Sequence, residues 1–251
     1  MSIGIKLGIF SELDAASAGI ITDGLILHLD AADTNSYPGS GDTWTDLSDE
    51  GNDVTLENSP TYNASGYFTF DGTNDYADRD DILGITDWPF TFSVWVKPST
   101  GGSSTDTIMG FAKGSANIMY TTIGVASNDQ FLVNIRNIGY IFTYLDDTPD
   151  ARDGDWYNYV ITCISDTERK TYINGVLNSS YGTVHYGGTY TIDVDVDFST
   201  AQNSFDIGRL GRSSHTDYFE GDYATCFVYN RELSADEVLE NYNVHKERFG
   251  Y

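Results

Sequence analysis

The chain is poor in positive charge and in cysteine, and it has no long apolar run. It holds 13 Lys and Arg against 38 Asp and Glu, so its formal net charge is -25. Proteins that bind nucleic acids neutralise phosphates with Lys and Arg, and no basic cluster occurs here. No run approaches the roughly 18 apolar residues that a membrane-spanning helix needs. We therefore expect neither nucleic acid nor a membrane as a partner.

Cysteine is represented by Cys163 and Cys226 alone, each inside an apolar run and outside any C-x-x-C motif. This placement is typical of buried free thiols in a protein that folds in a reducing compartment. The apolar stretch that follows Lys6 is too short for a secretory signal, which needs roughly 7 to 15 apolar residues. We therefore expect a chain without a signal peptide.

The sequence consists largely of short apolar or alternating runs, which are rich in Tyr, Phe, Val, Ile and Thr and are separated by Gly, Asn, Asp and Ser. This pattern predicts an all-β protein built as a two-sheet antiparallel sandwich. Asn174-Gly175 between two such runs indicates a hairpin. The expected strands are 25–30, 67–70, 90–97, 107–112, 118–125, 130–136, 138–145, 156–165, 168–173, 190–198, 204–209 and 221–229.

Near the C-terminus, the stretch from Ser234 to Glu237 has the pattern of a capping box. It predicts one helix that runs to about Lys246. The apolar face is expected to hold Val238, Leu239, Tyr242 and His245, with Glu237, Glu240 and Asn241 opposite. We interpret this helix as packing on the sandwich. Residues 1–22 are small, apolar and weakly periodic, so they predict an arm ahead of a single domain formed by residues 23–251.

Several segments in order resemble a known family. They are residues 23–32, 37–41, 43–48, 70–76, 90–98, 156–160, 172–175 and 221–234, which include Phe70-Asp71-Gly72-Thr73-Asn74-Asp75-Tyr76 and Phe90-Thr91-Phe92-Ser93-Val94-Trp95. The chain is similar to laminin-G-like domains of the concanavalin A-like lectin/glucanase superfamily over about residues 22–248. The resemblance implies a jelly-roll sandwich with one C-terminal helix.

The chain has a short form of this domain, which begins at Thr22-Asp23-Gly24-Leu25 directly after the arm. In this form it also resembles virion proteins of tailed bacteriophages. That resemblance implies a non-enzymatic structural, decoration or fibre protein, made in the host cytoplasm and located on the virion. The arm would then anchor the domain to other virion proteins or to sister subunits, and we expect a homo-oligomer. The alternative is an adhesin that binds host surface glycans, for which multivalent display would compensate for weak single-site affinity.

Aromatic residues in expected loops are the candidates for glycan binding. Tyr37, Trp44, Tyr140 and Tyr186 could stack on sugar rings. The competing interpretation, which applies to Trp44 above all, is a ring buried in the core. An exposed aromatic cluster would favour the adhesin, and burial of these rings would count against it.

Calcium is the one metal ion that the acidic composition and the resemblance favour, although no cofactor is required. Asp71, Asp75 and Asp222 belong to motifs that meet near one edge in such folds, and carboxylates are calcium ligands. Asp71 and Asp75 could equally form turns through bonds to their own backbone. The sequence contains no dense D-x-D-x-D-G loop.

The sharpest catalytic hypothesis is a glycoside hydrolase that uses Asp193, Asp195 and Asp197. On a strand, alternation would place all three carboxylates on one face, about 6.6 Å apart in steps of two. A retaining glycosidase needs two carboxylates about 5 to 5.5 Å apart. The Glu-x-Asp-x-(x)-Glu pattern of the superfamily's enzymes is missing. Three alternatives remain for these aspartates: a solvated face, a cation site and a catalytic pair. Our overall expectation is that the chain is not an enzyme.

Overall fold

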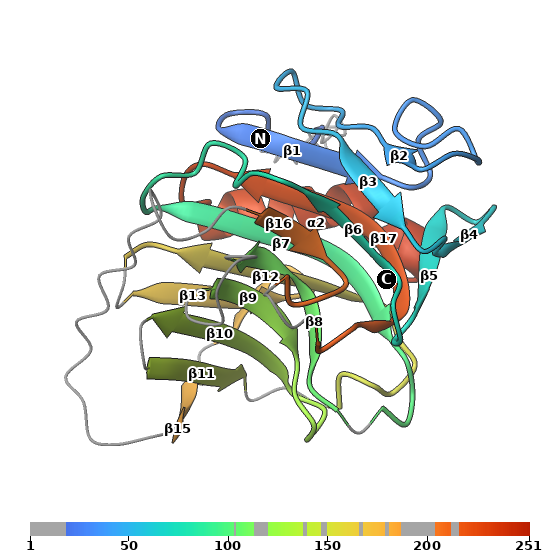
Figure 1. The fold of residues 1–251 in the computed structure, drawn as a ribbon. Coiled ribbons are helices and arrows are strands. Elements are labelled where there is room, and N and C mark those ends of the chain that lie inside the picture. The colour runs from blue at the N-terminus through green and yellow to red at the C-terminus, as the bar shows by residue number, and fades with distance from the viewer. Residues whose placement is uncertain are drawn as a thin grey trace, which may run out of the picture.

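The computed structural model describes residues 19–102, 104–112, 120–137, 140–146, 150–165, 168–178, 181–186, 204–211 and 216–251, and for 136, 137, 140–146 and 181–186 it describes the backbone alone. Within these residues the chain forms two antiparallel sheets that pack face to face, with one α-helix near the C-terminus (Figure 1). The predicted all-β sandwich with a single C-terminal helix is therefore confirmed.

The first sheet has the strand order β14-β13-β12-β7-β17-β5-β4, and β1 pairs with β17 beside β5. Its strands are β1 (Leu25–Asp30), β4 (Thr61–Asn63), β5 (Tyr67–Asp71), β7 (Phe90–Pro98), β12 (Tyr157–Cys163), β13 (Arg169–Ile173), β14 (Val176–Asn178) and β17 (Glu220–Tyr229). The first and last strands of the described chain, β1 and β17, pair with each other here, from Leu25 with Tyr229 to Asp30 with Thr225.

The second sheet has the order β15-β11-β10-β9-β8-β16-β6-β3-β2. Its strands are β2 (Thr43–Trp44), β3 (Val54–Glu57), β6 (Tyr76–Arg79), β8 (Asp106–Ala112), β9 (Tyr120–Val125), β10 (Phe131–Asn137), β11 (Tyr140–Asp146), β15 (Tyr181–Tyr186) and β16 (Ser204–Ile207). The sequence did not predict the short strands β2, β3 and β6, because two to four residues are too few to show alternation.

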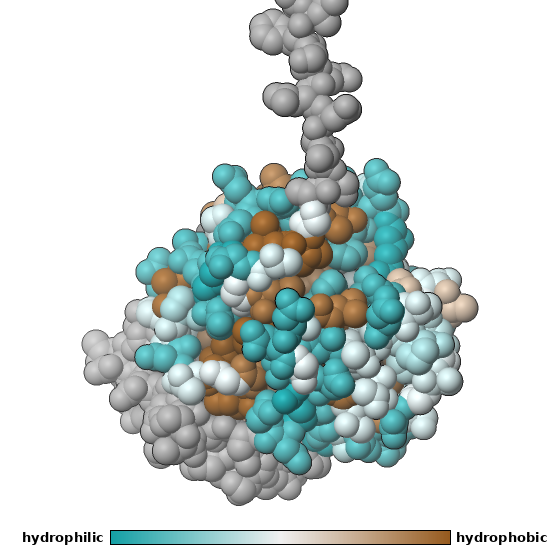
Figure 2. All heavy atoms as spheres, turned by 90° about the horizontal axis from the view of Figure 1, so that it is seen from above, coloured by the Kyte–Doolittle hydropathy of each residue, from teal (hydrophilic) through white to brown (hydrophobic). Residues whose placement is uncertain are grey.

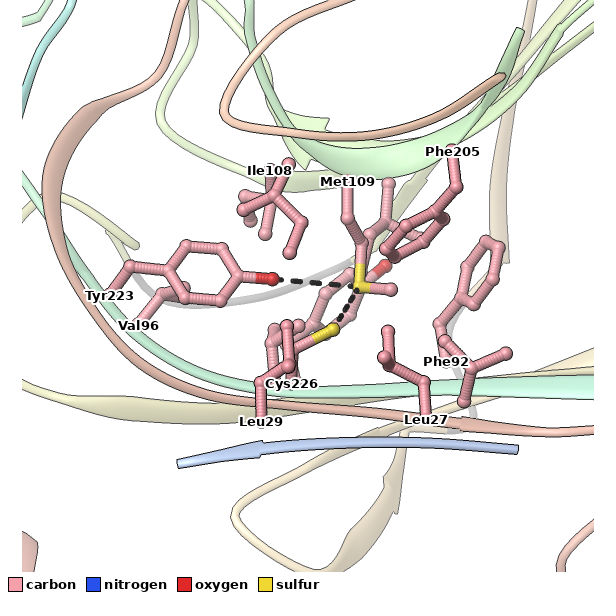
Figure 3. Close-up of a cluster of buried hydrophobic side chains, with 14 of the residues drawn as sticks. Leu27, Leu29, Phe92, Val96, Ile108, Met109, Phe205, Tyr223 and Cys226 are labelled. Atoms are coloured by element: carbon pink, nitrogen blue, oxygen red, sulfur yellow. Dashed lines mark hydrogen bonds between the residues drawn. The ribbon is translucent and has the colours of Figure 1, made fainter. Parts of the chain in front are cut away.

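The core lies between the sheets and is built from alternate residues of the central strands. In β7, Phe92, Val94 and Val96 face inward, while Ser93 and Trp95 lie on the outer face, and all are buried. Figure 3 shows how Met109 of the second sheet reaches Tyr223 and Cys226 of β17. Both cysteines are buried and free, as predicted.

Part of the outer face of the first sheet is covered by helix α2 (Ala235–His245) and the 3₁₀ helix η1 (Lys246–Phe249). Trp95 on that face stacks on Phe249, with ring centroids 4.2 Å apart, and on Tyr242 at 5.6 Å. The capping box is present, with the Ser234 side chain accepting from the Glu237 N–H and the Glu237 side chain accepting from the Ser234 N–H. The predicted hairpin is present as well, with positive φ at Asn174 and Gly175.

The packed face of α2 differs from the predicted one in two residues. Val238 and His245 are buried as expected, but Leu239 is 43% exposed and Asn241 is buried. Asn241 is held because its amide nitrogen donates to the Tyr229 hydroxyl and its amide oxygen accepts from the Ile21 N–H. Two hydrogen bonds satisfy the buried amide, so hydrophobicity alone misplaces the helix face.

Residues 20 and 21 already belong to the folded domain. Ile20, Ile21 and Leu25 pack against the buried cluster that includes Tyr229 and Val238.

The face seen from above is mainly hydrophilic around a broken patch of hydrophobic residues (Figure 2). Residues 1–18 of the predicted arm, and the expected strand 190–198, lie outside the described residues.

Among the described residues, none of the helices has the length and apolar character needed to cross a bilayer.

Candidate functional site

A polar groove of about 590 Å³ lies on the outer face of the first sheet, where β5, β17 and β7 run side by side. Thr69 and Asp71 come from β5, Glu220 and Asp222 from β17, and Lys97 from β7, and Ser99 follows β7. We call these six residues the polar groove set. They share one face because alternate residues of each strand point the same way.

Strand register arranges the set in two rows. The first row is Thr69, Asp222 and Lys97, since Asp222 pairs with Thr69 on one side and with Lys97 on the other. In the second row Glu220 pairs with Asp71, and the Ser99 N–H donates to the Glu220 carbonyl at 2.8 Å. Directly opposed side chains on neighbouring strands have Cβ atoms about 5 Å apart. The six side chains therefore form one continuous surface.

Two glycines permit this close arrangement. Gly221, between Glu220 and Asp222, has φ +149, and a Cβ there would meet the Lys97 carbonyl and Pro98 Cα. Gly72, directly after Asp71, has φ +69, and its Cβ would lie 2.8 Å from Glu220 Cβ. Any other residue would have to push β17 away from β7 or disturb the turn after β5.

The groove presents both hydrogen-bond donors and acceptors. The Thr69 hydroxyl donates to Asp222 Oδ1 at 2.6 Å, and the Ser99 hydroxyl donates to Glu220 Oε1 at 3.1 Å. Lys97 is half-buried and is the one cation among the lining residues, and within the described chain no ion pair joins it to Asp222 or to any other carboxylate. Carboxylates accept and an ammonium donates, so sugar hydroxyls can bond to both.

The structure brings together two of the three aspartates predicted to hold calcium. Asp71 and Asp222 both line the groove, but Asp75 is buried, where its Oδ2 accepts from the Asp71 N–H at 3.2 Å. Asp71 Oδ1 accepts from the backbone N–H groups of Thr73, Asn74 and Asp75. The described residues contain no group of three that could hold a metal ion. The turn-forming alternative accounts for Asp71.

The pKa of Asp71 reflects the same contacts. Partial burial would raise this pKa, but the hydrogen bonds from the backbone N–H groups of Thr73, Asn74 and Asp75 outweigh it and lower the pKa. A carboxylate that accepts several backbone N–H bonds stays ionised. Asp71 is therefore a fixed negative charge at the end of the groove and a poor proton donor.

Two of the four predicted sugar-binding aromatics lie in the core. Trp44 is fully buried and meets Phe68 edge-on at 4.9 Å between ring centroids. Tyr37 is 5% exposed, packs against Phe68 at 4.8 Å, and donates its hydroxyl to the Gly41 carbonyl. Rings buried this deeply offer no face for stacking on a sugar, which favours the core interpretation of Trp44 and gives Tyr37 the same role.

The other two predicted aromatics lie on neighbouring strands of the second sheet. Tyr140 begins β11 and Tyr186 ends β15, and Tyr186 pairs with Ile141. The structure therefore brings their backbones to the same end of the sheet, while their side chains lie outside the described part. Asp193, Asp195 and Asp197 lie in the undescribed segment as well.

Two half-buried aromatics, Tyr67 and Trp156, lie next to the groove. Tyr67 lies two residues before Thr69 on the same strand, and Trp156 precedes Tyr157, which pairs with Val96. The Tyr67 and Trp156 rings meet edge-on at 5.5 Å. Thr69, Lys97, Ser99 and Glu220 were missed, because single polar residues in or beside a strand carry no motif. For Thr69, the only signal was its alternation with the buried residues Phe68 and Phe70.

A second polar cluster lies on β6 and β16 and is organised around Arg209. Its guanidinium donates to Asp206 and Asp78, both at 2.7 Å, and lies 3.4 Å from the centroid of the Tyr76 ring. Burial raises the pKa of Asp78 to about 6, with Arg209 acting in the opposite direction and Asp206 in the same direction as burial. Because both carboxylates are tied to Arg209, we interpret this cluster as a brace between strands.

Solved structures with the same fold include enzymes and binding domains. Trypanosoma rangeli sialidase in complex with sialic acid matches with a TM-score of 0.63 and 17% identity, over 93% of this chain and 35% of the sialidase. The binding domain of botulinum neurotoxin serotype D matches with a TM-score of 0.62 and 15% identity, over 89% of this chain and 51% of that domain. The binding domain of botulinum neurotoxin DC in complex with SialylT matches with a TM-score of 0.60 and 15% identity, over 88% of this chain and 52% of that domain.

The chain thus spans about a third of the sialidase and about half of the toxin binding domains. Identities this low show a shared fold. No curated protein matches the sequence. The family model of the concanavalin A-like lectin/glucanases superfamily, in its laminin-G form, matches residues 71–239. That match takes in β7, the turn after β5 and the start of α2, and the chain belongs to the concanavalin A-like lectin/glucanase superfamily.

Proposed function

We propose that the chain is a non-enzymatic glycan-binding domain and that the polar groove set forms its binding site. The observation that carries the proposal is the alignment of three carboxylates, two hydroxyls and one ammonium group along a groove on the outer face of the sheet. Binding sites combine a concave shape with a few placed polar groups. Named neighbours with this fold, among them the neurotoxin binding domain in complex with SialylT, support a glycan as the ligand.

The non-enzymatic part of the proposal rests on the state of the carboxylates. A glycosidase needs one carboxyl group with a raised pKa to protonate the leaving oxygen. Asp71 has a lowered pKa and is bonded to three backbone N–H groups. Glu220 and Asp222 each accept a hydroxyl bond that fixes one carboxylate oxygen. This arrangement suits the binding of hydroxyl groups better than proton transfer to them.

A glycan screen of the full chain tests the proposal. The protein would be displayed multivalently, because one shallow site binds weakly. We expect selective binding that weakens at least tenfold in Lys97→Met and in Asp222→Asn. The matched controls are Lys246→Met and Asp80→Asn, which change the same charges away from the groove. Folded protein that binds no glycan, or binding that all four variants retain, would contradict the proposal.

We further propose that the domain is displayed on a tailed-phage virion through residues 1–18. These residues include Ile3, Ile5, Leu7 and Ile9 at alternate positions, as in an apolar strand. Ile20 and Ile21 pack on α2, so a deletion must stop before them. Removing residues 1–18 should leave the melting temperature unchanged and abolish self-association or particle binding. Association that survives the deletion would refute the anchor.

A further inference from the structure

We propose that the polar groove binds glycans without acidic groups and rejects sialylated ones. In this it would differ from the sialidase of the same fold whose structure contains sialic acid. This inference rests on the proposed function and names the ligand class of the same site. The groove walls carry Asp71, Glu220 and Asp222 against the single cation Lys97. Three carboxylates and one ammonium group give the groove a formal charge of -2.

The position of Lys97 does not offset the negative charge of the groove. It lies in the row of Asp222, whose Cα is its direct partner on β17, and Glu220 lies two residues from Asp222 on the same face. A sugar carboxylate placed on Lys97 would therefore lie within reach of two protein carboxylates. Neighbouring like charges on one face repel each other.

Asp71 keeps the groove negative over a wide pH range. The backbone bonds from Thr73, Asn74 and Asp75 lower its pKa against the effect of burial. The carboxylate therefore stays ionised in mildly acidic solution. The net charge of -25 on the whole chain adds a repulsion of longer range.

Neutral sugars meet no such penalty and find matching partners. Their hydroxyls can donate to the oxygens of Glu220 and Asp222 and accept from the Lys97 ammonium. Lys97 lines the groove and has no ion pair within the described chain, so its ammonium group is a donor that such a hydroxyl can use. The ligand class that the groove fits is a neutral oligosaccharide.

The test compares lactose, sialyllactose and a neutral trisaccharide of the same length, each attached to the same carrier. Binding to the full chain is measured at about 20 mM and 500 mM salt. At low salt we expect sialyllactose to bind about tenfold more weakly than the neutral trisaccharide, with the ratio narrowing at high salt as charges are screened. The neutral trisaccharide separates the effect of charge from that of size.

A pair of charge-matched double variants locates the effect. Glu220→Gln with Asp222→Asn keeps the acceptors for Ser99 and Thr69 but removes two charges. It weakens binding of the neutral trisaccharide, as expected for Asp222→Asn alone, but it should bring the ratio of the two affinities within about threefold of one. Asp49→Asn with Asp80→Asn removes two exposed charges elsewhere and should leave the tenfold ratio. If both double variants relieve the penalty equally, the groove is not its source and the inference fails.

The outcomes also separate the two proposals. Wild-type protein that binds sialyllactose as tightly as the neutral trisaccharide overturns the selectivity while leaving the glycan-binding function in place. Folded protein that binds none of the three on any carrier overturns both.

Discussion

The hydroxyl of Thr69 donates a 2.6 Å hydrogen bond to Asp222 Oδ1, joining residues 153 positions apart in the sequence. This bond links the outer faces of β5 and β17 in the middle of the polar groove. It also fixes one oxygen of Asp222, so the carboxylate presents a defined direction to a ligand. Groups held in place before binding lose less entropy when a ligand arrives.

Thr69→Val should therefore weaken glycan binding about three- to tenfold without unfolding the domain. Valine has nearly the same shape as threonine, and Thr69 is exposed, so the change in stability is expected to stay within about 0.5 kcal/mol. Calorimetric titration and thermal unfolding of the same sample separate the two effects. Thr55→Val, at an exposed threonine on β3 of the second sheet, is the matched control. Equal binding by Thr69→Val and wild type would show that the bond does not position Asp222 for a ligand.

Met109 is expected to be a major contributor to the contact between the sheets. Its sulfur lies 3.6 Å from the Tyr223 hydroxyl and 3.9 Å from Cys226 Sγ (Figure 3), and its side chain is fully buried. Met109→Ala should lower the free energy of unfolding by about 3 kcal/mol, because a cavity replaces the side chain. Met109→Leu keeps the volume and should cost less than about 1.5 kcal/mol. Denaturant unfolding measures both, and equal losses would contradict a packing role.

The C-terminal end is fastened to β1 by a charge cluster at Asp30. Arg248 Nη1 donates to Asp30 Oδ1 at 2.7 Å, and His245 Nε2 lies 3.7 Å from Asp30 Oδ2. Burial alone would raise the pKa of Asp30, but the contacts with His245 and Arg248 and the Ala32 N–H lower it to about 2. A carboxylate with a lowered pKa in the folded state stabilises the protein above its unfolded pKa and loses that contribution as the pH falls through the folded value.

Stability should therefore decline between about pH 5 and pH 2, and Asp30→Asn should remove part of that decline. The variant is expected to be less stable than wild type by about 2 kcal/mol at pH 6, and the two should converge near pH 2. Urea unfolding across this range is the measurement. Asp49→Asn, at an exposed position away from the Asp30 cluster, is the matched control. A difference between Asp30→Asn and wild type that stays constant down to pH 2 would exclude a role for ionisation.

The capping box of α2 gives a simpler stability prediction. The Ser234 side chain accepts from the Glu237 N–H at 3.3 Å, and Glu237 accepts in return from the Ser234 N–H at 2.8 Å. Ser234→Ala should destabilise the protein by about 1 kcal/mol, whereas Ser234→Gly should cost only a few tenths. Thermal unfolding distinguishes the two. An alanine variant as stable as the glycine variant would mean that the cap contributes little to the fold.

The sequence predicted the fold class well because the strands that form the core are long enough to show their period. Phe92, Val94 and Val96 alternate with Ser93 and Trp95, and the same alternation marks most central strands. The capping box and the Asn174-Gly175 turn are local features whose chemistry can be read from adjacent residues. The buried position of Asn241 could not be read in this way, since its partners Ile21 and Tyr229 lie elsewhere in the chain.

The candidate site was predicted only in part. Asp71 and Asp222 were chosen for calcium and do line one groove, but the neighbours that define its chemistry are set by strand register. Lys97 and Asp222 become neighbours only because β7 pairs with β17, and nothing within either segment specifies that pairing. Residue type alone left Trp44 as a candidate for both a sugar surface and the core, because its packing against Phe68 and Tyr223 depends on how the loop folds back.

Binding of a glycan in the polar groove can be seen in a crystal structure of the full chain soaked with the tightest neutral oligosaccharide from the screen. We expect a sugar ring within hydrogen-bond distance of Lys97 Nζ and of a carboxylate oxygen of Asp222 or Glu220. A sugar bound on the second sheet, with the groove open to the same soak and empty, would contradict this expectation.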